Sequence, residues 1–297
     1  MKITENGKNT LINELKDFDL EQTLECGQCF RFYKLDKEEY VIVAKNKMLH
    51  IKQDENQLIF YNTSKEDVEK IWTNYFDLDR DYDEIKSYLL KKDNKLESAI
   101  KENYGVRILN QDFHEVLISF IISQIKQIVK RISEQYGEYL GEVNGEKYYS
   151  FPNPEKLGKI TEEAFREMKS GFRAPYLYDA SQKLALGEIN EELFANLKEE
   201  DGRELLKSIK GVGDKVANCV LLFGLGYRNA FPIDVWIKRI MEAIYFGKET
   251  SKEEIQKFAS NHYGEYGGYA QQYLFCFGRN GKIGTNTDKK KKSNNKK

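Results

Sequence analysis

Hydrophobic residues gather in three short runs rich in Val, Ile, Tyr and Phe between residues 38 and 62, EEYVIVAKNKMLHIKQDENQLIFYN. The polar triplets Lys-Asn-Lys and Asp-Glu-Asn separate the runs and are typical of tight turns. The pattern therefore predicts an antiparallel meander. Ser64 and Asp67 then form a helix-capping pattern, and a helical face follows at Val68, Ile71, Trp72 and Tyr75.

Helical periodicity dominates the chain from there to about residue 278. Asp112 and Glu115 repeat the capping pattern ahead of VLISFIISQIKQIV, whose length and near-continuous apolarity predict one central buried helix. After Gly278 the residues are mainly Lys, Asn and Ser, and no regular structure is expected. Further helices are predicted over residues 205–209, 216–223, 235–244 and 269–277.

These patterns together predict an α+β fold without internal repeats. Residues 1–95 are expected to form an N-terminal antiparallel β-sheet domain that packs on a mostly α-helical domain. That second domain is predicted to span residues 96–279, with its last helix over residues 268–278. A disordered basic tail is expected over residues 280–297.

Composition narrows the class of protein. The chain has 297 residues, of which 40% are hydrophobic and 13% aromatic, as in a folded globular protein. No apolar run approaches the roughly 18 residues of a membrane-spanning helix, and the first ten residues lack the apolar stretch of a signal peptide. We therefore expect a cytoplasmic protein without a membrane partner, and the frequent Lys, Ile, Asn and Glu favour a prokaryotic source.

Four cysteines are too few and too unevenly spaced for a disulfide framework, which favours a reducing compartment. Cys26 and Cys29 could be half of a zinc site. No second pair follows at ligand spacing, and the chain contains three histidines. The sequence therefore predicts structural cysteines, no metal and no cofactor.

The net charge is −1, which by itself does not suggest nucleic-acid binding. Residues 279–297 carry eight positive charges against one negative, so the rest of the chain sums to −8. A basic tail on an acidic body is compatible with DNA or RNA contact. A solubilising disordered tail explains the same charges equally well.

The stretch KSIKGVGDKVA, residues 207–217, places two glycines between two apolar helical segments. This is the pattern of a helix–hairpin–helix, in which backbone N–H groups at Gly211, Val212 and Gly213 can face a phosphate oxygen. The stretch lacks the spacing of a phosphate-binding loop for nucleotides and the third glycine of a dinucleotide fingerprint. A plain corner between two helices remains an equally good interpretation of the turn alone.

Lys215 and Asp234 are the candidate reactive side chains. Lys215 begins an apolar helix, where the positive helix end and desolvation favour a free amine that can attack carbon. Asp234 follows Pro232 and occupies the N-cap position of the helix VWIKRIMEAI. Each residue also has an ordinary interpretation, because aspartates commonly cap helices and lysines at helix starts are usually solvated.

The arrangement Gly-Val-Gly-Asp-Lys215 followed by Pro-Ile-Asp234 resembles the Gly/Pro…Asp signature of the helix–hairpin–helix DNA glycosylases that use a lysine nucleophile. Separated segments narrow this to a resemblance to the 8-oxoguanine DNA glycosylase/lyase family over about residues 24–280. They are GQCFRF at 27–32, YFDLD at 75–79, GVRILNQD at 105–112, SFI at 119–121 and GYAQ at 268–271. Cys276 is the one cysteine after Cys219, so no iron–sulfur cluster is expected.

The resemblance implies a monomeric enzyme that flips an oxidised guanine out of double-stranded DNA and excises it. Lys215 would attack the sugar and nick the strand through a Schiff base, and Asp234 would stabilise positive charge on the sugar. The base would be bound by Gly27, Cys219, Gln271 and Phe275. Contacts to DNA would come from Gly211, Val212, Gly213, Lys126, Lys130, Phe172 and Arg173.

The chain departs from the family pattern where the opposite strand would be contacted. Ile125 stands at the expected wedging asparagine, Lys130 at an arginine, Phe172 at a tyrosine and Trp236 at a histidine. Lysine cannot make the bidentate base contact of arginine, so relaxed selectivity for the opposite base is expected. A glycosylase for another damaged purine and a non-catalytic DNA-binding module are the alternatives.

Overall fold

The computed structural model describes residues 1–122 and 125–279, so the expected basic tail lies outside the described residues. Six antiparallel strands form one sheet in the order β1-β2-β6-β5-β4-β3, and two more form a separate hairpin. The strands are β1 (Lys2–Asn6), β2 (Asn9–Asn13), β3 (Phe32–Asp36), β4 (Glu39–Ala44), β5 (Lys47–Asp54), β6 (Gln57–Tyr61), β7 (Tyr139–Val143) and β8 (Glu146–Tyr149).

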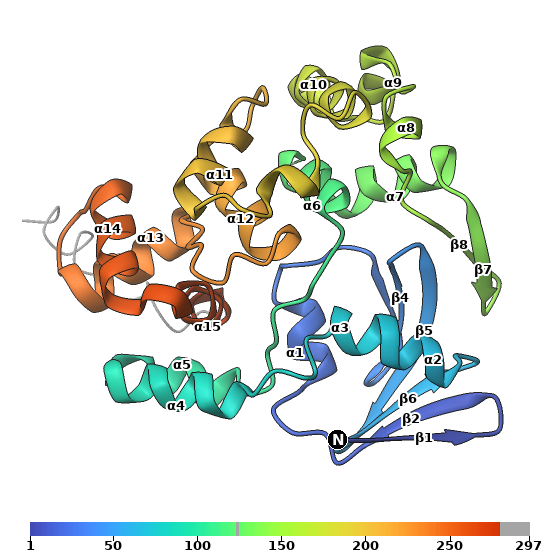
Figure 1. Cartoon of the computed structure of the whole chain (residues 1–297), viewed down its shortest axis with the longest axis horizontal. Helices are drawn as coiled ribbons and strands as arrows, with labels where there is room; N and C mark the ends of the chain where they lie inside the picture. The colour runs from blue at the N-terminus through green and yellow to red at the C-terminus, as the bar shows by residue number, and fades with distance from the viewer. Residues whose placement is uncertain (123–124, 280–297) are drawn as a thin grey trace, which may run out of the picture.

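Helices make up most of the remaining described chain, and Figure 1 shows them beside and above the sheet. The α-helices are α1 (Leu20–Glu25), α2 (Lys65–Asp67), α3 (Thr73–Tyr75), α4 (Tyr82–Lys92), α5 (Glu97–Glu102), α6 (Phe113–Ile121), α7 (Ile125–Tyr136), α8 (Pro154–Leu157), α9 (Glu162–Glu167), α10 (Ala174–Ala185), α11 (Glu199–Lys207), α12 (Asp214–Gly224), α13 (Val235–Met241), α14 (Lys252–Tyr263) and α15 (Gly267–Arg279). The 3₁₀ segments are η2 (Asn94–Leu96), η3 (Gly171–Arg173), η4 (Glu191–Phe194) and η6 (Gly264–Tyr266), and the π segments are η1 (Val68–Trp72) and η5 (Glu242–Phe246).

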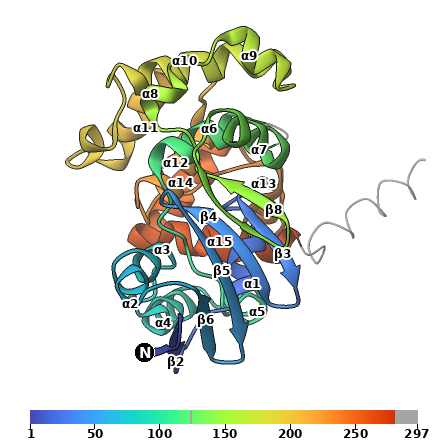
Figure 2. The ribbon, with the colours of Figure 1, turned by 90° about the vertical axis from the view of Figure 1, so that its right-hand side faces the viewer.

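Strand β4 explains why the sheet is covered on both faces. Tyr40 and Ile42 belong to a core with the helical residue Trp72 on one face, and Val41 and Val43 pack with Tyr148 of the β7–β8 hairpin on the other. Figure 2 shows this hairpin beside β3 and β4. A strand buried on both sides reads as a continuous apolar run, which is why EYVIVA shows little alternation.

The predicted meander is confirmed by β4, β5 and β6, and the N-cap at Ser64 is confirmed by its 3.1 Å bond from the Asp67 N–H. The prediction of one central buried helix is wrong. Helix α6 ends at Ile121, and the extended backbone of Ile122 (φ −83°, ψ 151°) separates it from α7.

Asp112 occupies the predicted N-cap position of α6, but its side chain does not cap the helix. The carboxylate of Asp112 makes no cap bond and instead accepts the Lys45 N–H at 3.1 Å and the Lys45 Nζ at 3.0 Å. Lys45 lies in the turn between β4 and β5, and it holds the carboxylate by an ion pair as well as a backbone hydrogen bond, in place of the helix cap.

The buried Arg107 joins the N-terminal segments to the helices. Its guanidinium donates to the carbonyls of Lys16, Asp17, Asp77 and Arg80 at 2.6 to 3.1 Å. The α+β class with a sheet beside a helical part is confirmed. Helix α4 packs into the core of the helical part although it precedes residue 95, so a boundary at residue 95 stays a proposal.

Candidate active site

The stretch around residues 207–217 forms the predicted helix–hairpin–helix. Helix α11 ends at Lys207 and α12 begins at Asp214. Gly211 has φ +79°, and a Cβ there would lie 2.3 Å from the Tyr176 ring, so only glycine fits. Gly213 has no neighbour within 4 Å of such a Cβ, which leaves the space ahead of α12 open.

Two bonds fix the hairpin on α10. The Lys210 N–H donates to Asp179 Oδ2 at 2.9 Å, and Lys183 Nζ donates to the Ser208 carbonyl at 2.6 Å. Gly213 is the N-cap residue of α12 and offers no side-chain acceptor to the first turn. The amide groups at this helix end therefore remain available to an anion, and the positive helix end favours one.

Lys215 lies in the first turn of α12, and its side chain turns toward the protein. Its Nζ lies 4.9 Å from the centroid of the Phe120 ring, a cation–π contact. Cys219 lies one turn further along α12 and is buried, at 3% exposure. Burial raises the pKa of the Cys219 thiol to about 11, against the opposing effect of Lys215. Cys219 therefore stays an uncharged, apolar wall beside the amine.

Asp234 occupies the predicted N-cap of α13. Its Oδ1 accepts the Ile237 N–H at 2.8 Å, which fixes the side chain at the helix start. The remaining carboxylate lone pairs are free for a second interaction, since the ionised group has about four acceptor sites.

Both candidate reactive residues line one cavity of about 70 Å³, together with every predicted base-pocket residue. The predicted members are Gly27, Lys215, Cys219, Asp234, Gln271 and Phe275. They come from the loop after α1, from α12, from the start of α13 and from α15. The structure therefore brings together residues 27 and 275 from opposite ends of the described chain.

Gln271 is 4% exposed, and its Oε1 has no hydrogen-bond partner. A buried amide oxygen without a partner costs free energy, so it indicates a group that a ligand satisfies. Gly27 has φ +85°, and a Cβ there would lie 3.2 Å from Phe275 Cε1. The backbone of Gly27 thus approaches the Phe275 ring as closely as glycine allows.

Sequence reasoning missed five further lining residues: Cys26, Phe120, Phe223, Pro232 and Gln272. Phe120 and Phe223 stack at 5.7 Å and form an apolar wall. Their apolarity looked like ordinary core in the sequence. Gln272 directly follows Gln271, and such a pair of polar residues inside an apolar helix is the one signal that could have revealed it.

The predicted DNA-contacting side chains lie outside this cavity. Lys126 and Lys130 are exposed on α7, and Lys130 pairs with Glu134 at 3.7 Å. Phe172 is 69% exposed with the Arg173 guanidinium 4.6 Å from its ring. Trp236 is 48% exposed beside Asp234. The side chain of Ile125 lies outside the part of the chain that the structure describes.

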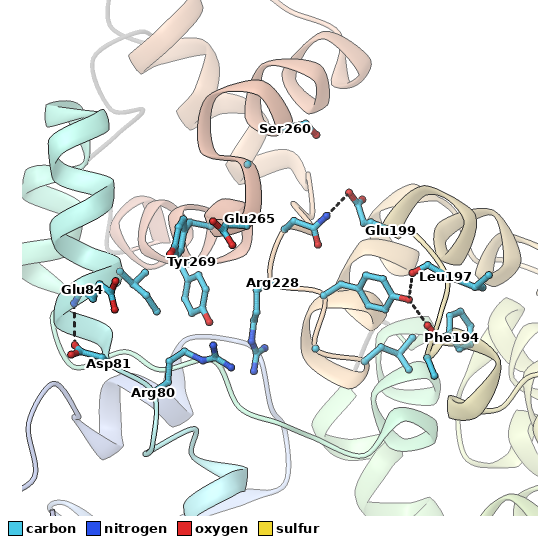
Figure 3. A pocket seen from close by; sticks show the side chains of 18 of the residues that line it. Arg80, Asp81, Glu84, Phe194, Leu197, Glu199, Arg228, Ser260, Glu265 and Tyr269 are labelled. Atoms are coloured by element: carbon cyan, nitrogen blue, oxygen red, sulfur yellow. Dashed lines mark hydrogen bonds between the residues drawn. The ribbon is translucent and has the colours of Figure 1, made fainter.

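A larger cavity of about 910 Å³ lies on another face of α15. Figure 3 shows Tyr269 of α15 there, pointing toward Arg80 and Arg228. The charged residues that line this larger cavity are mainly acidic, and none of the predicted site residues lines it. This cavity is therefore poorly suited to DNA and separate from the candidate active site.

Within residues 1–122 and 125–279, no three His, Cys, Asp or Glu side chains gather closely enough to hold a metal ion. No helix in these ranges is long and apolar enough to cross a membrane.

A helix–hairpin–helix that presents a lysine and an aspartate to one small pocket defines the class of base-excision DNA glycosylases. In agreement, residues 119–263 match the model described as "HhH-GPD superfamily base excision DNA repair protein". Residues 10–117 match the model described as "8-oxoguanine DNA glycosylase, N-terminal domain".

The chain belongs to the 8-oxoguanine DNA glycosylase family. It is 32% identical to the "Probable N-glycosylase/DNA lyase" of Methanothermobacter thermautotrophicus, over 73% of this chain and 75% of that protein. The structure of the Clostridium acetobutylicum 8-oxoguanine glycosylase/lyase with DNA containing cytosine opposite 8-oxoG matches with a TM-score of 0.91 and 37% identity, covering 95% of this chain and 99% of that one. The structure of MBOgg1 with a low-affinity DNA ligand matches with a TM-score of 0.90 and 41% identity, covering 94% and 98%.

Proposed function

We propose that this protein is a bifunctional enzyme that excises 8-oxoguanine from double-stranded DNA and then nicks the strand at the abasic site. The observation that carries the proposal is the single cavity shared by Lys215, Asp234 and the unpartnered Gln271. A nucleophile, a carboxylate and a reader of polar edges are the groups that base excision requires. Relatives named N-glycosylase/DNA lyase support both activities.

In this proposal the base is recognised between Phe275 and Cys219. The carbonyl of Gly27 accepts a hydrogen bond from N7–H, a donor that 8-oxoguanine has and guanine lacks. Guanine presents a lone pair there instead, and leaving a buried carbonyl facing a lone pair costs about 1–3 kcal/mol. Gln271 pairs its free Oε1 with the Watson–Crick edge.

The chemistry follows from the two reactive side chains. The amine of Lys215 attacks C1′ of the deoxyribose, and the bond to the base breaks, with the bonding electrons leaving on the base. The carboxylate of Asp234 stabilises the positive charge that develops on the sugar. The Lys215 nitrogen then loses a proton and the C1′–O4′ bond breaks, with its electrons leaving on O4′, so that a Schiff base forms. Loss of the 2′ proton then breaks the bond between C3′ and its oxygen, which expels the 3′ phosphate and nicks the strand.

Reduction with borohydride tests this mechanism, because it converts a Schiff base into a stable amine. We expect a covalent adduct with a duplex that contains 8-oxoguanine, and none with Lys215→Gln. Lys207→Gln is the matched control, since this lysine precedes the hairpin and is ion-paired with Glu204 and Asp214. DNA binding without any trapped adduct in the unaltered protein would leave only a DNA-binding module.

We also infer that the enzyme tolerates different bases opposite the lesion. Lys130 replaces a family arginine and already pairs with Glu134, so it offers a weaker and less directional base contact. Single-turnover excision with each of the four opposing bases tests this inference. Rates that differ by orders of magnitude among them would contradict it. The same assay with other damaged purines decides the lesion range.

A further inference from the structure

The larger cavity beside α15 contains a buried hydroxyl group that has no partner. Tyr269 lines this cavity of about 910 Å³ and is 2% exposed, and its hydroxyl has no hydrogen-bond partner among the described residues. Figure 3 shows the Tyr269 ring directed toward the guanidinium groups of Arg80 and Arg228. A buried polar group without a partner costs free energy, so this hydroxyl indicates a position where a ligand can supply the missing bond.

Positive charge exceeds negative charge around this hydroxyl. The Asp77 carboxylate accepts a hydrogen bond from Arg80 Nε at 2.9 Å and lies 4.0 Å from the Arg228 guanidinium, so two cations share one carboxylate. The Leu222 carbonyl accepts from Arg228 at 3.0 Å and fixes that side chain. The terminal nitrogens of Arg80 make no hydrogen bond with any residue that the structure describes, and its side chain is 47% exposed. A guanidinium with free N–H groups is suited to a carboxylate or a phosphate.

The Tyr269 hydroxyl is available to such an anion as a donor. Burial raises the pKa of this hydroxyl, against the opposing effects of Arg228 and Arg80. It therefore keeps its proton at neutral pH. An anion placed between Tyr269 and the two arginines would accept hydrogen bonds from a phenol and from a guanidinium at the same time.

The outer part of the cavity has the opposite charge. Four exposed carboxylates line it and pair with none of the basic side chains that the structure describes, and we call them the acidic rim: Asp81, Glu84, Glu191 and Glu265. A simple anion, or a nucleic acid, would be repelled by this rim on its way to the arginines. A ligand that carries cationic groups beside its anionic group would be attracted at both places.

The remaining wall of the cavity is apolar and firmly held. The Tyr227 hydroxyl donates to the carbonyls of Phe194 and Leu197 at 2.6 and 2.9 Å, and all three residues line the cavity. Lysine and arginine side chains bury their carbon stems against such surfaces while their charged ends reach carboxylates. A volume of about 910 Å³ also lies within the range of cavities that hold ligands larger than one amino acid.

We propose that this cavity is a docking site for the basic C-terminal end of a partner protein. The terminal carboxylate of the partner binds Arg80, Arg228 and the Tyr269 hydroxyl. Its lysine or arginine side chains meet the acidic rim. The charge pattern of the cavity, positive inside and negative outside, selects this ligand over DNA, over a free phosphate and over a peptide without basic residues.

The docking site and the candidate active site can be occupied together. Tyr269 and Gln271 are two residues apart on α15, but they line different cavities. A partner bound beside Tyr269 therefore leaves the cavity that contains Lys215 open to DNA. The docking site does not depend on the reaction proposed for the active site.

Titration calorimetry of the full-length protein with the peptide Gly-Gly-Lys-Lys tests the proposal. We expect saturable binding of one peptide per chain, weakened by added salt because the acidic rim is exposed. Amidation of the peptide C-terminus should weaken binding by about tenfold or more, since it removes the charge that the arginines bind. Gly-Gly-Gly-Gly and inorganic phosphate should each bind more weakly than Gly-Gly-Lys-Lys.

Tyr269→Phe removes only the hydroxyl and should weaken binding of Gly-Gly-Lys-Lys by about tenfold. Tyr273→Phe is the matched control, because Tyr273 lies on the same helix, is 2% exposed and also has an unpartnered hydroxyl, but does not line the cavity. It should bind like the unaltered protein. Arg80→Gln should reduce the preference for the free carboxylate over the amide, a ratio that general damage to the fold would not change selectively.

Four results would overturn the proposal. The first is no binding of Gly-Gly-Lys-Lys to the unaltered protein, and the second is equal binding of the free and amidated peptides. Binding of phosphate that depends on Tyr269, without binding of the peptide, would replace the peptide end by a small anion. Displacement of the peptide by saturating duplex DNA would place it on the DNA-binding surface instead of this cavity.

Discussion

Asp234 has two possible roles that a pair of substitutions can separate. Its carboxylate caps α13 by accepting the Ile237 N–H at 2.8 Å, and it also faces the cavity that contains Lys215. Asp234→Asn keeps an N-cap acceptor but removes the charge. Asp234→Ala removes both. The cap contributes to folding and the charge to the proposed reaction, so the two variants should differ in stability and agree in lost activity.

The magnitudes follow from the local geometry. Asparagine and aspartate are about equally good N-caps, so Asp234→Asn should lower the free energy of unfolding only by the lost charge–dipole term, about 0.3–1 kcal/mol. Asp234→Ala should lower it by about 1 kcal/mol, and by up to about 2. Domains are stable by about 5–15 kcal/mol, so neither variant should be appreciably unfolded. Loss of one charge-stabilising group typically slows the chemical step by about 10²–10³.

Urea unfolding and single-turnover excision of 8-oxoguanine measure the two effects separately. Both variants should bind the lesion duplex, and both should excise about 10²-fold more slowly or worse. Ser251→Ala is the control, because Ser251 caps α14 through the Glu254 N–H at 3.1 Å and lies outside the cavity. It should lose stability as Asp234→Ala does and keep its excision rate. Unchanged turnover in Asp234→Asn would remove Asp234 from the mechanism.

Three further predictions use the same measurements. Gly211→Ala should lower the free energy of unfolding by at least about 1–2 kcal/mol, because φ is +79° and the added Cβ would lie 2.3 Å from Tyr176. Gly213→Ala should lower the free energy of unfolding by less, because no atom lies within 4 Å of its Cβ. Equal losses in the two variants would contradict this reasoning. Lys126→Ala should reduce the salt dependence of duplex binding by about 0.9 in log–log slope if it contacts one phosphate, and an unchanged slope would exclude that contact. Hydrogen bonds from two tyrosines, a histidine and a backbone N–H lower the pKa of Asp93 below its ordinary 3.8, although burial acts in the opposite direction. The stability that the ionised Asp93 contributes should therefore be lost as pH falls below that value. Urea unfolding across pH should show that Asp93→Asn loses less stability in acid than the unaltered protein does.

Local patterns in the sequence were sufficient for several elements. The meander, the N-cap at Ser64 and the two helices around Gly211 depend on residues within a few positions of one another, and the structure confirms all of them. Lys215 and Asp234 were also marked locally, by a helix start and an N-cap. The proximity of Gly27 to Phe275 has no local signal, and it was expected only from the family resemblance.

The errors arose where distant segments decide the local structure. Asp112 carries a capping pattern, but its carboxylate binds Lys45 of the turn between β4 and β5. The β7–β8 hairpin packs against Val41 and Val43. The residues 139–149 by themselves do not indicate this contact, because Val41 and Val43 are distant in the sequence. The 3.2 Å bond from Gln272 Nε2 to the Cys26 carbonyl joins residues near opposite ends of the described chain. Such pairings depend on tertiary packing, which overrides local propensity.

The start of α15 shows how tertiary packing sets the spacing of the site. The Gly268 N–H donates to the Arg228 carbonyl at 2.7 Å, and a Cβ on Gly268 would lie 2.8 Å from that oxygen and 2.4 Å from Leu222 Cδ1. Glycine therefore lets α15 press against α12 and the loop that leads to Asp234. Gln271 lies less than one turn further along the same helix. The contact at Gly268 thus couples the proposed base reader to the proposed catalytic carboxylate, and it explains why the GYAQ segment begins with glycine.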